Sequence, residues 1–218
     1  MKRYQLAIFD LDGTILDTLD DLADSVNDAL HACGYPTLPE EEVKSYVGNG
    51  IRKLVERSVP KTCTREQMEE TLSCFVDSYL KRCCCKTHPY SGISTLFDAL
   101  RQAGVQCAVV SNKIDSAVRI LCDTYFPGQI DYCAGEKKGI PRKPAPDMIR
   151  GALRTLGVEE ADAVYIGDSD VDITSAQNAG LPCISVTWGY RDRQFLLEHG
   201  AVLLADTVQS LADLILQA

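Results

Sequence analysis

The chain has 218 residues, of which 45% are hydrophobic and 24% are charged, which is enough apolar material for a sizeable core. Its 31 acidic residues outnumber its 22 basic residues and give a net charge of −9. This charge argues against nucleic acid or an anionic membrane surface as a partner, because both attract clustered lysine and arginine. No apolar run reaches the roughly 18 residues that span a bilayer, and the N-terminal segment does not resemble a signal peptide. We expect a globular protein of the cytoplasm.

Ten cysteines are spread along the chain, and no two of them form a C-x-x-C pair. The run Cys83-Cys84-Cys85 lacks the two-residue spacer of a zinc knuckle, and adjacent side chains point in divergent directions. We therefore expect reduced, buried or half-buried thiols, as is usual for cytoplasmic proteins. The sequence assigns no further role to this run.

The first 85 residues predict one buried strand followed by helices. The apolar run of residues 4–9 predicts a strand that ends abruptly in the polar segment DLDGT. Apolar side chains at three- and four-residue spacing then predict a helix over residues 17–33. Three more helices are expected over 37–46, up to about residue 58, and over 64–80, with Thr37–Glu40 and Thr64–Gln67 as candidate capping boxes. Residues 16–83 thus contain helices and no convincing strand.

After a turn at residues 88–92, predicted helices and strands alternate. The predicted strands are 105–110, 130–133, 163–166, 183–186 and 201–204; the predicted helices are 93–103, 115–125, 146–156, 171–179, 192–199 and 208–217. Such alternation is typical of a parallel sheet that helices cover on both faces. We expect an α/β fold with a Rossmann-like core of residues 1–15 and 86–218, and with a helical insert of residues 16–85.

Polar residues follow the predicted strands, at the edge where open α/β sheets bind ligands. They are Asp10 and Asp12, then Ser111-Asn112-Lys113, then the stretch leading to Lys143, then Asp168 and Asp172. Two carboxylates about 4 Å apart repel by roughly 4 kcal/mol at an effective dielectric of 20, so such a cluster needs a counter-charge. Oxygen ligands favour Mg²⁺ over zinc or copper.

Asp10 and Asp12 are two residues apart, so in an extended segment their side chains face the same way. Gly13 allows a sharp turn that presents backbone N–H groups to an anion. One carboxylate can then attack while the other donates and later accepts a proton. A strand-end turn with capping aspartates would explain an isolated D-x-D-G segment, but it leaves the three other polar strand ends unexplained.

Four segments in this order, DLDGTILDT, VVSNK, KPAPDM and YIGDSDVDI, resemble motifs one to four of the haloacid dehalogenase superfamily of phosphatases. The resemblance covers nearly the whole chain and implies that fold, with residues 16–85 as the helical cap. The segments LDTLDDLADSVNDAL, SYVGNGIRKLVERS and VTWGYRDR are most similar to the phosphoglycolate phosphatases within it. The implied activity is Mg²⁺-dependent hydrolysis of a small phosphomonoester, 2-phosphoglycolate, through an aspartyl-phosphate.

The resemblance also implies roles for the core residues. Asp10 would be the nucleophile, Asp12 the acid and base, and Lys143 the cation that neutralises Asp10 and the phosphoryl group. The hydroxyl of Ser111 and the backbone around Asn112 would hold phosphate oxygens, with Gly13 and Thr14 also placed in substrate binding. Mg²⁺ would be held by Asp10, the backbone carbonyl of Asp12 and Asp168, while Asp172 would bind it through water or orient its ligands.

The candidate cap residues for substrate binding are Gly48, Asn49, Gly50, Arg52 and Lys53. They offer backbone N–H groups at the start of a predicted helix, followed by two cations, and such a helix start suits a carboxylate. The match to the superfamily's cap segment supports this role, and a plain helix–helix turn at Gly48-Asn49-Gly50 is the alternative.

Alternatives on the same core are a phosphosugar phosphatase, a pyrophosphatase and a β-phosphoglucomutase-like isomerase. A haloacid dehalogenase proper needs no acid at position 12, so Asp12 argues against it. A receiver-like module, in which a phosphorylated aspartate acts as a switch, would need only about half of this chain and no helical insert. The expected partner is a small phosphate ester, and the sequence leaves open whether the chain is a monomer or a homodimer.

Overall fold

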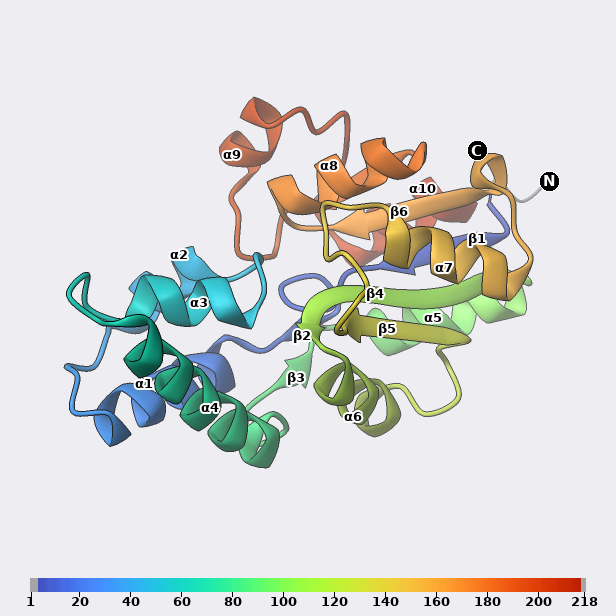
Figure 1. Cartoon of the computed structure of the whole chain (residues 1–218). Helices are drawn as coiled ribbons and strands as arrows, with labels where there is room; N and C mark the ends of the chain where they lie inside the picture. The colour runs from blue at the N-terminus through green and yellow to red at the C-terminus, as the bar shows by residue number, and fades with distance from the viewer. Residues whose placement is uncertain (1–3, 217–218) are drawn as a thin grey trace. The chain divides into compact units, whose positions relative to one another are not determined.

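The structure, a computed structural model, describes residues 4–216 of the chain. The chain divides into two compact units: one contains the residues up to Asp17 and from Pro89 onward, and the other is Thr18–His88. The first unit holds the large sheet and the second consists mainly of helices (Figure 1). Across the described residues, the helices are too short or too polar to cross a membrane.

The first unit is built on a parallel sheet of six strands in the order β5-β4-β1-β6-β7-β8. The strands are β1 Leu6–Phe9, β4 Gln106–Ile114, β5 Tyr132–Glu136, β6 Ala163–Gly167, β7 Cys183–Val186 and β8 Leu203–Ala205. From β1 the sheet grows in one direction through β4 and β5, and in the other direction through β6. The strand order therefore reverses at β1, and the carboxyl ends of β1, β4 and β6 meet where α/β sheets bind ligands.

Helices cover both faces of this sheet, as the sequence predicted (Figure 1). On one face lie α5 (Ile93–Gln102), α6 (Asp115–Tyr125) and α10 (Val208–Leu216), and on the other lie α7 (Asp147–Leu156) and α8 (Asp170–Ala179). In β1, Ala7 and Phe9 face the first layer, whereas Leu6 and Ile8 face the second. All four side chains are fully buried, which explains why this strand is an uninterrupted apolar run.

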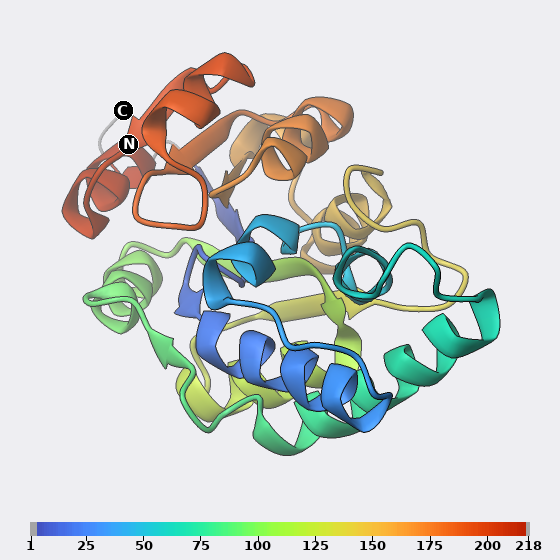
Figure 2. The same cartoon turned by 90° about the vertical axis from the view of Figure 1, so that its left-hand side faces the viewer.

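The second unit contains α1 Leu19–Ala32, α2 Glu40–Tyr46, α3 Ile51–Ser58 and α4 Arg65–Arg82. α1 packs along α4, and both views show the pair side by side (Figures 1 and 2). The predicted capping box at Thr64 and Gln67 is confirmed at the start of α4. The one predicted at Thr37 and Glu40 is wrong, because Pro39 precedes α2 and makes no side-chain cap, while Asn27 ties down the approaching chain through the backbone of Leu38.

The two segments that connect the units pair as a short sheet of β2 (Leu16–Asp17) and β3 (His88–Pro89). Just beyond β2, the buried carboxylate of Asp21 accepts hydrogen bonds of 2.9–3.1 Å from the N–H groups of Lys86 and Thr87 and from the Thr87 hydroxyl. Asp21 therefore fixes the segment through which the chain leaves the helical unit. The sequence predicted no strand here, since a two-residue strand is too short to show a periodic pattern.

The end of β4 differs most from its prediction. Ser111, Asn112 and Lys113 were expected in a loop after a strand ending at residue 110, but they continue β4, whose register with β5 shifts between Val110 and Ile114. β5 also begins and ends later than the predicted 130–133. Gly135 explains the close pairing, because a Cβ there would collide with the backbone of Lys113 and Asp115.

α2 begins three residues later than predicted, and the remaining boundaries differ by at most two residues: α9 is Arg193–Glu198 and β8 is Leu203–Ala205. A short 3₁₀ helix at Glu160–Asp162 was not predicted, and residue 217 of the last predicted helix lies outside the described residues. All ten cysteines are free thiols. In the run, Cys83 is buried, but Cys84 and Cys85 are exposed, so the expectation of burial is wrong for those two.

Candidate active site

Polar side chains gather at the carboxyl ends of the three central strands, and most of them are buried. They are Asp10, Thr14, Ser111, Asn112, Lys113, Lys143, Asp168 and Asp172, with Asp12 partly exposed. A buried polar group is costly unless it has a hydrogen-bond or charge partner. The contacts among these residues therefore define the candidate site.

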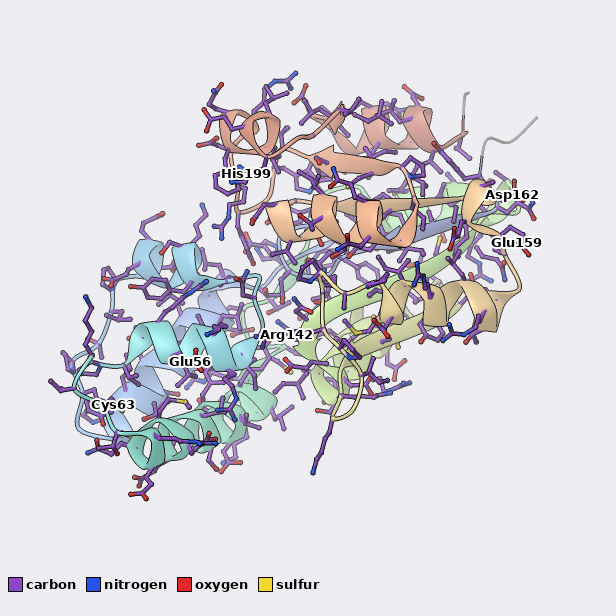
Figure 3. The ribbon with its side chains drawn as sticks, turned by 45° about the horizontal axis from the view of Figure 1, so that its top comes forward. Glu56, Cys63, Arg142, Glu159, Asp162 and His199 are labelled. Carbon is purple, nitrogen blue, oxygen red and sulfur yellow. The ribbon has the colours of Figure 1, made fainter. Side chains whose placement is uncertain are left out.

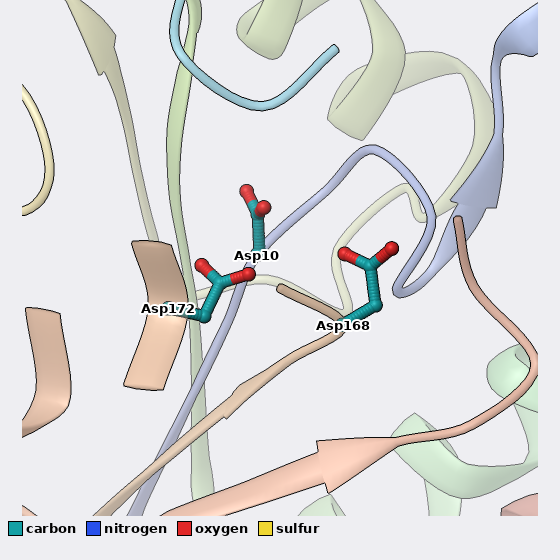
Figure 4. Close-up of side chains that lie close together, drawn as sticks. All are labelled: Asp10, Asp168 and Asp172. Carbon is teal, nitrogen blue, oxygen red and sulfur yellow. The ribbon is translucent and has the colours of Figure 1, made fainter. Parts of the chain in front are cut away.

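Three carboxylates converge at this edge of the sheet (Figure 4). Asp10 follows β1, Asp168 follows β6, and Asp172 lies in the first turn of α8. Each offers one oxygen, and these oxygens all lie within 4.8 Å of one another. Negative charges this close repel, so the cluster needs positive charge nearby.

Lys143 supplies part of that charge from the segment between β5 and α7. Its side chain is 1% exposed, and Nζ lies 2.9 Å from Asp10 Oδ1, 2.7 Å from Asp172 Oδ1 and 2.9 Å from the Tyr165 hydroxyl. Burial works against the charged ammonium, but Asp10 and Asp172 outweigh it, so the pKa of Lys143 is raised above its usual value. The ammonium therefore remains charged between the two carboxylates.

The side-chain amide of Asn112 fixes the backbone that carries Lys143. Asn112 Oδ1 accepts from the N–H of Lys143 at 2.8 Å, and Nδ2 donates to its carbonyl at 3.0 Å. This double hydrogen bond crosses from β4 to a segment 31 residues further along the chain. Asn112 thus positions Lys143 through its side chain, while the sequence had predicted a role for the backbone around Asn112.

Asp172 is held at both of its carboxylate oxygens. Oδ1 contacts Lys143 and lies 3.1 Å from the hydroxyl of Tyr165, and Oδ2 accepts from the hydroxyl of Ser169 at 2.6 Å and from its N–H at 3.2 Å. The Ser169 contacts form a capping box at the start of α8. The Asp172 side chain therefore caps α8 and also belongs to the carboxylate cluster.

Tyr165 completes the contacts around Lys143 and was missed by sequence reasoning. It lies in β6, and its hydroxyl also lies 3.1 Å from the carbonyl of Val110 in β4. Burial, with Asp172 and Asp10 nearby, raises the pKa of Tyr165 well above its usual value, so the hydroxyl keeps its proton. In the sequence it belongs to an apolar strand, and only the hydroxyl at its tip hints at a polar role.

The ionisation of the carboxylates reflects their crowding. Burial raises the pKa of Asp10 to about 7; Lys143 opposes this shift, and Asp172 and Asp12 add to it. Burial, Asp172 and Asp10 likewise raise the pKa of Asp168 well above its usual value. Asp10 Oδ1 is buried and, although it lies close to Lys143, accepts no well-directed hydrogen bond. The three carboxylates could therefore hold a further cation.

The loop after β7 holds Asp168 in place. The N–H of Tyr190 donates to Asp168 Oδ2 at 2.7 Å, and the Thr14 hydroxyl donates to Oδ1 at 3.3 Å. Trp188 Nε1 in turn donates to the Thr14 carbonyl at 3.1 Å. A Cβ on Gly13 or on Gly189 would collide with Asp168, so both glycines allow this close approach. The resemblance implied a substrate role for Thr14, and Trp188 and Tyr190 were not among the candidate site residues.

Asp12, another candidate residue of the core, pairs with Lys113, which the sequence placed after a predicted strand without assigning it a role. Lys113 Nζ lies 2.5 Å from Asp12 Oδ1, with side-chain exposures of 2% and 14%. Ser111 lies just before, and its hydroxyl accepts from the N–H of Lys113 at 3.3 Å. The site thus contains a second buried cation.

The candidate cap residues lie in the helical unit around the start of α3. Gly48 and Gly50 have φ values of 111° and 81°, which other residues rarely adopt. Arg57 steadies this turn by donating to the carbonyl of Tyr46 and to Asn49 Oδ1, both at 3.1 Å. Hydrogen bonds from Arg57 thus stabilise the turn at residues 48–50, and the sequence did not predict this role of Arg57.

The two cap cations are already paired within the helical unit. Arg52 forms a two-point ion pair with Glu69 at 2.6 and 3.0 Å, and Lys53 lies 2.6 Å from Glu56 of the same helix. Glu56 is labelled in Figure 3. The side chains of Arg52 and Lys53 remain 43% and 46% exposed. A negatively charged ligand would have to compete with these glutamates.

Comparison with known proteins agrees with this arrangement. The sequence profile of the haloacid dehalogenase-like hydrolases matches residues 7–186. Phosphoglycolate phosphatases from Psychrobacter arcticus and Neisseria meningitidis are 32% and 33% identical, over 98% and 92% of this chain and 96% and 88% of theirs. The crystal structure of a candidate phosphoglycolate phosphatase from Lactobacillus delbrueckii subsp. bulgaricus is 39% identical, covers 100% of both chains and superposes with a TM-score of 0.94.

The chain therefore belongs to the haloacid dehalogenase-like hydrolases, and the predicted family and α/β fold are confirmed. Within that family it is a phosphatase of the phosphoglycolate phosphatase-like kind.

Proposed function

We propose that this enzyme hydrolyses 2-phosphoglycolate, or a phosphomonoester of similar size, with Mg²⁺ and a covalent phosphate on Asp10. The observation that carries the proposal is the buried Lys143 ammonium, which lies within 2.9 Å of Asp10 and Asp172 in a three-carboxylate cluster. The names of the relatives supply the substrate.

In the proposed reaction, Asp10 attacks phosphorus and the bond to the alkoxide breaks, while Asp12, which enters this step protonated, gives its proton to that oxygen and becomes a carboxylate. Asp12 then takes a proton from water, whose oxygen displaces Asp10 and releases phosphate. Lys143 balances the charge of the phosphoryl group, and the Ser111 hydroxyl binds one of its oxygens. Asn112 and Tyr165 keep Lys143 in line with Asp10.

The residues present fit a Mg²⁺ ion. The ligands are all oxygens, and Asp10 Oδ1 is buried without a well-directed hydrogen bond. If Asp10, Asp168 and Asp172 are ionised, this cluster exceeds the charge of Lys143 by two negative charges, which a divalent ion would balance. Asp10, Asp168 and the Asp12 carbonyl would hold it. Asp172, engaged at both oxygens, would orient the site instead. The ion would supply positive charge to the phosphoryl oxygens.

The helical unit would act as the cap, with the substrate carboxylate bound at residues 48–53. Support comes from the glycine turn, the backbone N–H groups at the start of α3, and the two cations that follow. Because Glu69 and Glu56 hold those cations, we expect a moderate effect: Arg52→Ala or Lys53→Ala, in at least one case, should narrow the preference for phosphoglycolate about tenfold. Hydrolysis of nitrophenyl phosphate should hardly change.

The test is a phosphate-release screen with Mg²⁺ over 2-phosphoglycolate, glycerol phosphate, a hexose phosphate and pyrophosphate, with Asp10→Asn as the blank. We expect the highest kcat/KM for 2-phosphoglycolate. A preference for a hexose phosphate or pyrophosphate would overturn the substrate and leave the phosphatase standing. Isomerisation of a hexose phosphate with a bisphosphate activator would show mutase chemistry instead.

A further inference from the structure

A second lysine lies buried at the candidate site, on β4. The side chain of Lys113 is 2% exposed, and its Nζ lies 2.5 Å from Asp12 Oδ1. An ammonium in such surroundings is costly without a close partner, and a charge-assisted hydrogen bond to a carboxylate supplies one. The longer β4 brings Lys113 here, since the strand continues to Ile114 instead of ending at residue 110.

The two buried lysines contact different carboxylates. Lys143 contacts Asp10 and Asp172, whereas Lys113 contacts Asp12. The candidate nucleophile and the candidate acid therefore each have a cation of their own. The two lysines come from different segments, Lys113 from β4 and Lys143 from the stretch between β5 and α7, so each can be substituted separately.

Proton transfer depends on the orientation of the acid. Donor and acceptor oxygens must approach to about 2.6–3.2 Å, and a carboxylate that rotates away loses this distance. The side chain of Asp12 is 14% exposed and lies just beyond the end of β1. A short ion pair to a buried ammonium limits the rotation of its carboxylate.

We propose that Lys113 is a positioning residue that holds Asp12 in the orientation for proton exchange with the phosphoester oxygen. This proposal rests on the proposed role of Asp12 as the acid and base. Lys113 then acts on leaving groups that need a proton, such as the alkoxide of an alkyl phosphate. It has little effect on a nitrophenolate, which leaves without one, or on capture of the phosphate by Lys143 and Ser111.

The test is a double-mutant cycle with Lys113→Met and Asp12→Asn. Methionine keeps an unbranched chain of similar length and removes the charge. We would measure the first turnover, before hydrolysis of the phospho-enzyme, with an alkyl phosphate and with nitrophenyl phosphate. Lys113→Met should lower the first-turnover rate about tenfold or more with the alkyl phosphate and less than about threefold with nitrophenyl phosphate. KM should stay nearly constant. In the Asp12→Asn background the same change should have almost no effect.

Three results would overturn the proposal. One is an equal loss of first-turnover rate with both esters in Lys113→Met. Another is a loss of rate that persists when Lys113→Met is made in the Asp12→Asn background, because Lys113 would then act on the substrate directly. The third is full alkyl turnover in Lys113→Met. If Asp12→Asn itself keeps alkyl turnover, the proposed acid has failed instead. Lys113→Arg keeps the charge and should retain more alkyl turnover than Lys113→Met, and Lys113→Gln replaces the methionine variant if that one does not fold.

Discussion

At the scale of single residues, Tyr165 shows how an uncharged side chain can organise charged neighbours. Its hydroxyl lies 2.9 Å from Lys143 Nζ and 3.1 Å from both Asp172 Oδ1 and the Val110 carbonyl. A neutral donor and acceptor in this place bridges the cation, the carboxylate and the neighbouring strand without adding charge. Its ring packs among apolar side chains of the layer that contains α7 and α8.

Replacing Tyr165 with phenylalanine keeps the ring and removes the hydroxyl. Lys143 then loses one of its three contacts, and a hydrogen bond to a charged group contributes about 1.5–3 kcal/mol. We expect kcat to fall by about ten- to a hundredfold, measured as phosphate release under saturating substrate. Tyr132→Phe, on the sheet-edge strand β5, is the control and should leave kcat unchanged. Equal kcat in Tyr165→Phe and the native enzyme would mean that Lys143 needs no such support.

Asp168 differs from the other two carboxylates of the cluster in its partners. Its carboxylate accepts hydrogen bonds from the Tyr190 N–H and the Thr14 hydroxyl, and not from a lysine. Asp168→Asn keeps the shape and hydrogen bonds to the N–H but removes the charge. The Mg²⁺ concentration for half-maximal activity should rise by about tenfold or more, measured by metal titration after removal of divalent ions with EDTA. An unchanged metal requirement would remove Asp168 from the ion's ligands.

At the scale of elements, the two candidate capping boxes give a matched pair for a stability measurement. The Thr64 hydroxyl accepts from the Gln67 N–H, and Gln67 Oε1 accepts from the Thr64 N–H. At the start of α2 no side chain caps the helix in this way. Thr64→Ala should lower the free energy of unfolding in urea by about 1 kcal/mol, and Thr37→Ala by only a few tenths of that. Equal losses would show that capping does not distinguish these helices.

The sequence predicted the elements well where the apolar pattern is long, and less well where contacts decide. The helices of both units follow from periodicity, because their buried faces repeat, and the central strand β1 follows from its uninterrupted apolar run. The continuation of β4 through Ser111, Asn112 and Lys113 does not, since polar residues in a strand look like a loop. It is stabilised by the pairing with β5 that Gly135 permits, and this pairing is not visible along the chain.

The candidate site divides in the same way. The charged residues of the four motifs were predicted, because they follow strands that must end at one edge of a parallel sheet. Tyr165 and the loop of Trp188–Tyr190 were not, and Lys113 was placed at this edge without a role, because the roles of these residues arise from contacts across the fold. The pairing of Arg52 with Glu69 also requires the packing of α3 against α4.

At the scale of the whole molecule, the sheet order explains why residues from Asp10 to Asp172 meet. β1 is central, so the polar ends of β4 and β6 flank it, and the chain's return to the sheet after Pro89 brings them there. The buried carboxylates repel one another, while the apolar layers on both faces hold the strands together. The fold thus holds mutually repelling carboxylates close together at the ligand-binding edge of the sheet, where a phosphatase carries out phosphoryl transfer.

The central claim is that Asp10 carries the phosphoryl group, and acid-quench mass spectrometry during turnover of 2-phosphoglycolate with Mg²⁺ tests it most directly. The account predicts a transient gain of one phosphoryl group, located by peptide mapping at Asp10, and a loss of both the adduct and several powers of ten of activity in Asp10→Asn. Turnover that persists in Asp10→Asn, or a phosphoryl group found on another residue, would contradict it.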